Sequence, residues 1–129
     1  MDFSRMIPEL SVYDINLTKK FYSELGFKIE YERVEDKFVF MSFQESQFMF
    51  EQIHDDGWNI GELVYPLGRG INFSIAVDDI EELYQLVNNL NIELYRDLTR
   101  NIYKVNEIEE MQKEFLIQDP NGYLLRFTN

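Results

Sequence analysis

The side chains able to do chemistry in this chain are mostly acidic. Its 129 residues include 24 Asp and Glu, 12 Lys and Arg, one His and no Cys, for a net charge of −12. The absence of cysteine excludes disulfides, zinc–thiolate sites and a cysteine nucleophile. Nucleic-acid binding needs basic surface, so the charge argues against it. The acid excess either serves solubility or attracts a cationic small molecule.

One stretch of the chain occurs twice. Residues 7–15 read IPELSVYDI, and residues 72–80 read NFSIAVDDI. An offset of 65 residues takes Asp14 to Asp79, and it aligns apolar positions with apolar positions. Two copies at one offset, without a gap, predict one supersecondary unit that is used twice.

The first copy is predicted to be a βαβββ unit. Asp14 or Asn16 can cap a helix, because either side chain accepts a hydrogen bond from a free amide of the first turn. Gly26 stands where a helix needs a left-handed residue to end. The predicted strands are separated by short polar turns and comprise residues 5–12, 27–33, 37–43 and 47–53.

The second copy is predicted to repeat this order, with a first strand from Ile71. Asp78 or Asp79 caps its helix, and acids follow in the first turn. A hairpin closes the chain around residues 119–122 (DPNG), where Pro presets the first turn dihedral and Gly accepts a positive φ. Residues 106–113 (NEIEEMQK) are predicted to be a charged loop or a single turn. The remaining predicted strands are residues 92–96, 98–103, 114–118 and 123–128.

We expect a single domain over residues 1–129. Its modules, residues 5–53 and 71–128, are joined by a long connection over residues 54–70, and such loops are often functional or assembly arms. Trp58 within the connection is either a surface contact or a plug at the edge of the core. No apolar run approaches membrane-spanning length, and the first residues lack a signal-peptide core. A cytoplasmic protein without a membrane partner is therefore expected.

These motifs resemble the vicinal oxygen chelate superfamily, which includes glyoxalase I, extradiol dioxygenases and bleomycin resistance proteins. The similar pieces are PELSVYDI with FYSELGF at the front, GRGINFSIAVDD in the middle and EFLIQDPNGYLLRF at the end. The chain is most similar to the bleomycin-resistance-protein-like group. The resemblance implies an α+β fold in which two βαβββ modules form a cup-shaped mixed sheet with helices on its outer face. It also implies a homodimer whose clefts use both chains.

The resemblance further implies four positions that line the cup. The metal enzymes place His, Glu, His and Glu there, and the matching residues here are Ile7, Glu51, Asn72 and Arg126. Ile has no lone pair, and a guanidinium stays protonated. We therefore expect no metal and no other cofactor. Glu51 and Arg126 either pair in place of the metal or merely fill space.

Strand alternation predicts which side chains share a face with these positions. Glu9 should lie on the face of Ile7, and Gln47 and Met49 on the face of Glu51. The opposite face should pack under the helices and is apolar, with Leu10, Val12, Phe48, Phe50, Phe73, Ile75, Val77, Leu125 and Phe127.

The predicted ligand-binding residues combine charged groups with aromatic surface. Trp58 offers a face for stacking or for a cation, and two tyrosines beside the second module add contact area. No catalytic residue is assigned. The full set is Glu9, Glu51, Trp58, Tyr65, Asn72, Tyr103 and Arg126.

The resemblance thus favours a metal-independent protein that sequesters a small molecule, such as a cationic antibiotic, in a cleft of a homodimer. One alternative is an enzyme, either a lyase with an altered metal site or a metal-free isomerase that uses Glu51 or Glu9 as its base. Another is a non-catalytic partner subunit.

Overall fold

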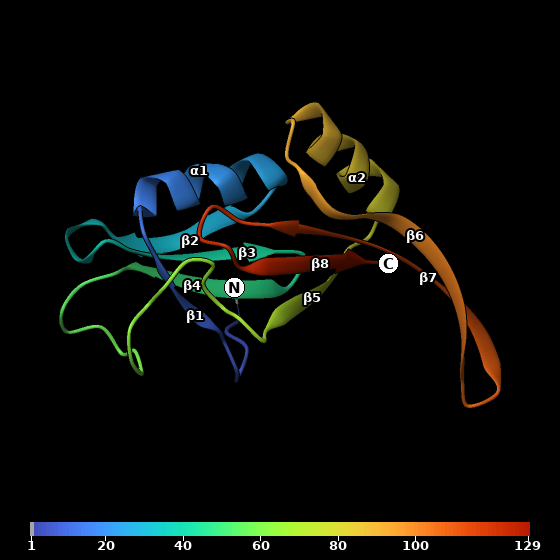
Figure 1. Ribbon diagram of the computed structural model, residues 1–129, viewed down its shortest axis with the longest axis horizontal. Coiled ribbons are helices and arrows are strands. Elements are labelled where there is room, and N and C mark those ends of the chain that lie inside the picture. Colours follow the sequence, from blue (N-terminus) through green and yellow to red (C-terminus); the bar gives the residue numbers. More distant parts are fainter. Residues whose placement is uncertain (1) are drawn as a thin grey trace. The chain divides into compact units, whose positions relative to one another are not determined.

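The computed structural model describes residues 2–129 and contains two four-stranded mixed sheets with one α-helix each (Figure 1). The chain divides into two compact units, the first ending at Leu67 and the second spanning Gly68–Asn129. Each unit has the order βαβββ. The predicted α+β class and the predicted repeat are both confirmed.

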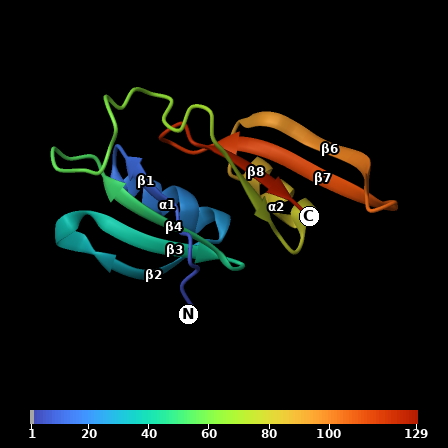
Figure 2. The ribbon, with the colours of Figure 1, turned by 90° about the horizontal axis from the view of Figure 1, so that it is seen from below.

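The first unit pairs its first strand with its last. The sheet order is β1-β4-β3-β2, in which β1 is parallel to β4 and the other pairs are antiparallel (Figure 2). A short 3-10 turn, η1, separates β2 from β3. The elements are β1 (Glu9–Val12), α1 (Ile15–Leu25), β2 (Lys28–Arg33), η1 (Val34–Asp36), β3 (Phe38–Phe43) and β4 (Ser46–Gln52).

The ends of α1 follow the sequence signals. The Asp14 carboxylate accepts hydrogen bonds from the backbone N–H groups of Asn16 and Leu17, at 2.9 and 3.1 Å. Gly26 ends the helix with φ 110°. Asp14 is therefore the N-cap, and it satisfies amide groups that have no partner within the helix.

The core of the first unit is built around Tyr22 of α1. Its side chain is completely buried, and its ring centroid lies 4.6 Å from that of Phe50 and 5.1 Å from that of Phe27. Leu10 and Val12 of β1 are buried as well. One face of the first sheet thus packs against α1, as alternation predicted.

The second unit repeats this arrangement. The sheet order is β5-β8-β7-β6, with β5 parallel to β8. The Asp79 carboxylate caps α2 by accepting a hydrogen bond from the N–H of Glu82 at 3.0 Å. The elements are β5 (Asn72–Ala76), α2 (Ile80–Asn89), β6 (Leu94–Val105), β7 (Ile108–Gln118) and β8 (Leu124–Thr128).

The prediction of a charged loop or single turn at residues 106–113 was wrong. β6 and β7 form one long hairpin, and its turn is Asn106-Glu107, with φ of 52° and 69° (Figure 1). Beyond Thr99 and Glu114 the hairpin extends past β8 as a two-stranded ribbon. A ribbon exposed on both faces needs no alternation of apolar and polar residues, so no strand pattern was visible in residues 106–113.

The DPNG turn forms as predicted. The buried Asp119 carboxylate accepts hydrogen bonds from the N–H groups of Asn121 and Tyr123, at 2.8 and 3.0 Å. Gly122 donates its N–H to the carbonyl of Asp119 and has φ 98°. Within residues 2–129, no helix is long and apolar enough to cross a membrane.

Gly26→Ala should destabilise the protein more than Gly61→Ala. Both glycines have positive φ, so alanine is strained at each, by about 1–2 kcal/mol when the backbone cannot relax. At Gly26 a Cβ would also lie 3.0 Å from Cε1 of Phe43, whereas at Gly61 nothing lies within 4 Å. Urea unfolding of both variants measures the difference. Equal losses of unfolding free energy would show that the Phe43 contact contributes nothing.

Candidate functional site

The face of the first sheet opposite α1, called here the helix-free face, collects the predicted polar residues of this unit. In the strand register, Glu9 of β1 lies beside Met49 of β4, and Ser11 lies beside Glu51. Residues that are neighbours in register point to the same side of a sheet. The predicted sharing of one face by Glu9, Met49 and Glu51 is therefore confirmed.

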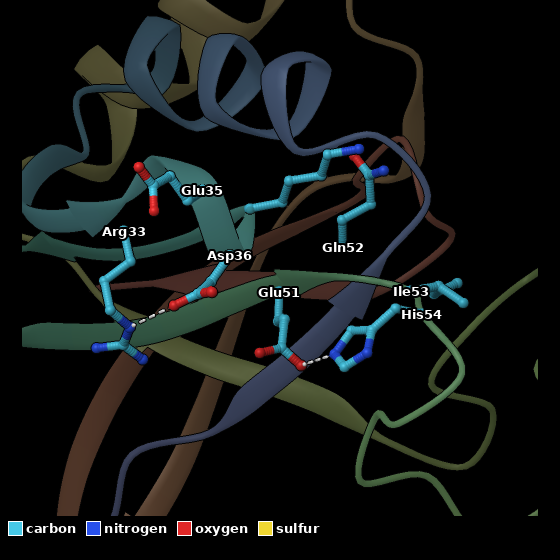
Figure 3. A pocket seen from close by; sticks show the side chains of 8 residues that line it. Arg33, Glu35, Asp36, Glu51, Gln52, Ile53 and His54 are labelled. Carbon is cyan, nitrogen blue, oxygen red and sulfur yellow. Dashed lines mark hydrogen bonds and ion pairs between the residues drawn. The ribbon is translucent and has the colours of Figure 1, made fainter.

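Glu51 is held in place by the only histidine of the chain. Nε2 of His54 lies 2.9 Å from Oε1 of Glu51 (Figure 3). Nδ1 of His54 accepts a hydrogen bond from the backbone N–H of Asp56 at 3.2 Å. Because Nδ1 is the acceptor, a neutral imidazole carries its proton on Nε2 and donates it to the carboxylate. His54 thereby orients Glu51.

Sequence reasoning gave His54 no role, because it lies outside the four positions implied by the resemblance. A signal was present in its spacing, three residues after Glu51 at the end of a predicted strand. The contact nevertheless depends on the turn at Gly57, whose N–H bonds the carbonyl of His54. Strand periodicity does not describe such a turn.

A hollow of about 400 Å³ opens beside this pair. In Figure 3 the Glu51 and His54 side chains face each other, and the Arg33 guanidinium lies against the Asp36 carboxylate, 3.5 Å away. Both signs of charge are thus present, with the Glu51 carboxylate oriented toward His54. The lining residues are Arg33, Glu35, Asp36, Lys37, Glu51, Gln52, Ile53 and His54.

Glu9 and Glu51 influence each other electrostatically. Partial burial raises the pKa of Glu9, repulsion from the Glu51 carboxylate raises it further, and the Arg33 guanidinium opposes both effects. Repulsion between two neighbouring carboxylates is relieved when a cation binds beside them.

A separate polar cluster lies in the second unit around Arg126. Nε of Arg126 donates to Oδ1 of Asn72 at 3.0 Å, and Nη1 lies 3.5 Å from Oε2 of Glu114. Arg126 comes from β8, Asn72 from β5 and Glu114 from β7. Arg126 therefore has an anionic partner within its own unit, and the sequence analysis missed Glu114. A pairing of Arg126 with Glu51 stays a prediction.

The strand register gives Arg126 a counterpart in the first unit that differs from Glu51, the residue implied by the resemblance. Ser74 lies beside Arg126, and Glu9 lies beside Met49. Glu9 and Ser74 are 65 residues apart, the offset of the repeat. The counterpart of Arg126 is thus Met49, and Glu51 lies two residues further along β4.

The residues at the four implied positions do not fit a divalent metal. A set of Ile7, Met49, Asn72 and Arg126 offers one neutral amide oxygen, one weak thioether, one side chain without a lone pair and one cation. With Glu51 in place of Met49, the set gains a single carboxylate. Among residues 2–129, no three His, Asp or Glu side chains are grouped so that they could hold a metal ion.

The predicted aromatic contacts lie on the surface. Trp58 is 97% exposed, which excludes a plug in the core of its unit. Tyr65 is exposed, and its ring centroid lies 6.5 Å from that of Tyr13. Tyr103 is exposed on β6 in the second unit. Trp58 and Tyr65 belong to the connection and do not line the hollow. The first unit therefore exposes two aromatic side chains outside it.

No protein-family model and no curated protein matches this chain. A solved structure does: a glyoxalase/bleomycin resistance protein/dioxygenase superfamily member from Vibrio splendidus 12B01 is 37% identical over 93% of both chains, with a TM-score of 0.44. The chain belongs to this superfamily. The sequence identity carries that assignment, and it confirms the resemblance recognised in the sequence.

Two further structures of the superfamily fold support the architecture. A glyoxalase/bleomycin resistance protein/dioxygenase from Alicyclobacillus acidocaldarius is 25% identical and has a TM-score of 0.65, with 95% of this chain and 88% of that one covered. The bleomycin resistance determinant encoded on transposon Tn5 is 20% identical and has a TM-score of 0.67, with 98% of each chain covered. At 20% identity the second likeness concerns the fold alone.

Glu9→Gln is expected to change how stability depends on pH. The folded protein raises the pKa of Glu9 above its ordinary value of 4.5, so it binds that proton more tightly than the unfolded chain does. This stabilisation is complete below the ordinary value and is lost as the pH rises through the raised pKa. The wild type should therefore lose melting temperature relative to Glu9→Gln across that window.

Melting temperatures of both proteins between about pH 4 and about pH 7 test this expectation. Glu51→Gln removes the repulsion that helps to raise the pKa of Glu9, and it should therefore narrow the pH range over which the melting temperature changes. Glu62→Gln, at an exposed glutamate that does not line the hollow, serves as the control. A difference between wild type and Glu9→Gln that stays constant with pH would contradict the argument.

Proposed function

We propose that the protein binds a cationic small molecule without the help of a metal, on the helix-free face of the first sheet. The carrying observation is the pair of carboxylates, Glu9 and Glu51, with Glu51 oriented by His54 at 2.9 Å. A cation between them relieves their mutual repulsion and forms charge-assisted contacts with both.

The charge of the whole molecule supports a cationic ligand. A net charge of −12 raises the local concentration of cations and lowers that of anions. The superfamily includes a bleomycin resistance determinant, the Tn5 protein. Bleomycin, a bulky cationic glycopeptide, is therefore the first compound to test, and antibiotic sequestration is the physiological role that we propose.

Calorimetric titration with bleomycin should detect binding that weakens as salt is raised, because screening reduces attraction between charges. Glu51→Gln removes one charge-assisted contact and should weaken binding about tenfold or more. Glu9→Gln and Trp58→Ala should weaken it as well, and Glu62→Gln should leave it unchanged. Prior treatment with a chelator should have no effect.

An anionic compound of similar size completes the experiment. If the anion binds and bleomycin does not, Arg126 and Asn72 become the better anchor, for a carboxylate or a phosphate, and the cation proposal is wrong. In the second unit the Arg126 guanidinium is 34% exposed and accessible to such a group.

A catalytic role is the second candidate, and the raised pKa of Glu9 beside an oriented Glu51 favours it. A carboxyl group with a raised pKa, such as Glu9, can serve as an acid or a base beside a second carboxyl group, as a metal-free isomerase would require. Metal analysis of the purified protein separates this candidate from a lyase. One equivalent of firmly bound zinc, nickel, manganese or iron would contradict every metal-free proposal.

We further propose that the protein is a homodimer. The two-stranded part of the β6–β7 hairpin exposes several apolar side chains, and such a ribbon alone is marginally stable in water. A second copy of the chain would cover these side chains, which are Ile102, Tyr103, Val105, Ile108 and Met111. The cytoplasmic location of the protein stays a prediction.

Light scattering at micromolar concentration should give twice the mass of one chain. Ile108→Asp places a charge on the apolar tip of the hairpin, where the wild-type side chain is 63% exposed, and should shift the mass toward that of the monomer. Glu109→Gln, one residue further along the same strand, is the matched control. A monomer mass for the wild type would refute the proposal.

A further inference from the structure

The helix-free face carries three aromatic rings that the sequence analysis did not assign to it. The rings of Tyr31 and Phe40 are stacked, with centroids 5.4 Å apart and an interplanar angle of 15°. The centroid of Phe38 lies 5.9 Å from that of Tyr31. Phe38 and Phe40 are buried. We call Tyr31, Phe38 and Phe40 the aromatic platform.

Two groups of the chain itself already lie on this platform. Cζ of Arg33 lies 4.1 Å from the ring centroid of Phe38, a cation–π contact. The ring of Phe3 stands edge-on to Phe40, with centroids 5.2 Å apart and an interplanar angle of 62°. The platform thus accepts a cation at one end and an aromatic ring at the other.

Phe3 belongs to a short segment that is hydrogen-bonded to Gln47 of β4. Ser4 donates its backbone N–H to Oε1 of Gln47 at 2.9 Å, and Nε2 of Gln47 donates to the carbonyl of Asp2 at 2.7 Å. Residues 2–8 form no strand and lead into β1. Phe3 remains 60% exposed even though it contacts a buried ring. The ring of Phe3 is therefore open to solvent on one side, where a ligand can approach it.

The carboxylates lie within reach of the platform. Glu51 is the register neighbour of Phe38, and Met49 separates Phe40 from Glu9. Neighbouring strands are about 4.8 Å apart, so Glu51 is one strand spacing from the platform and Glu9 is about 10 Å from it. A ring joined to an ammonium group by two or three carbons spans the distance to Glu51, the nearer of the two carboxylates.

We propose that the aromatic platform is the ring-binding subsite for an arylalkylammonium ligand, and that Phe3 is a resident occupant displaced by the ligand's ring. The ammonium group binds at Glu51, and the Glu9 carboxylate adds attraction from the neighbouring strand β1. The inference rests on the proposed function, because it uses the same two carboxylates, and it adds the class of ligand.

Calorimetric titration with phenethylammonium tests the subsite. Displacing Phe3 reduces the apparent affinity of the wild type, so Phe3→Ala should bind about tenfold more tightly. Gln47→Leu, which removes both hydrogen bonds to the segment and leaves the ring, should change affinity in the same direction. Leu17→Ala, which shortens an exposed apolar side chain on α1, should bind like the wild type. Butylammonium and phenylpropionate should bind all four proteins far more weakly.

Weaker binding by Phe3→Ala would overturn the inference, because Phe3 would then be a wall of the site. Unchanged binding by both Phe3→Ala and Gln47→Leu would overturn it too. Bleomycin titration of the wild type and of Tyr31→Leu keeps the two proposals apart. If the wild type and Tyr31→Leu bind bleomycin equally, and Phe3→Ala does not change phenethylammonium affinity, the subsite is wrong and the proposed function stands. Bleomycin binding that is insensitive to Glu51→Gln would remove the proposed function itself.

Discussion

The parallel pairing of the first and last strands of each unit is the constraint on which the other features depend. Parallel strands need a long crossover, so a helix must lie between β1 and β2 and cover one face of the sheet. The same pairing sets the register that puts Glu9 beside Met49 and Ser11 beside Glu51. One register therefore fixes both the aromatic core under α1 and the carboxylates on the opposite face.

Much of this could be predicted from the sequence, because local signals and the tertiary structure agree. The repeat, the Asp14 and Asp79 caps and the alternation along β1 and β4 each have a period or a position that is visible in one segment. The role of His54 was not visible, since its tautomer depends on the N–H of Asp56 two residues away in a turn. The extent of β7 was also missed, because exposed strands carry charge on both faces.

The aromatic residues show why strand alternation alone misjudged the site. Phe48 and Phe50 pack under α1, as predicted, but Phe38 and Phe40 lie on the opposite face with Glu51 and Met49 as their register neighbours. A face with carboxylates on two strands and rings on two others is neither a polar cleft nor a dry core. Such a surface suits the proposed function, because it offers negative charge and apolar rings on one face.

β7 is paired with a strand on both edges in one part of its length and on one edge in the other. From Glu114 to Gln118 it pairs with a strand on both edges, β6 on one and β8 on the other, and Lys113 bonds the backbone and side chain of Asn129. From Ile108 to Gln112 the strand pairs with β6 alone. Local opening is easier where a backbone has fewer partners. The backbone amides of the two-stranded part can thus exchange hydrogen with solvent by local opening, while those of the three-stranded part stay hydrogen-bonded. A molecule that binds the two-stranded part would reduce this local opening and leave the fold of the three-stranded part unchanged.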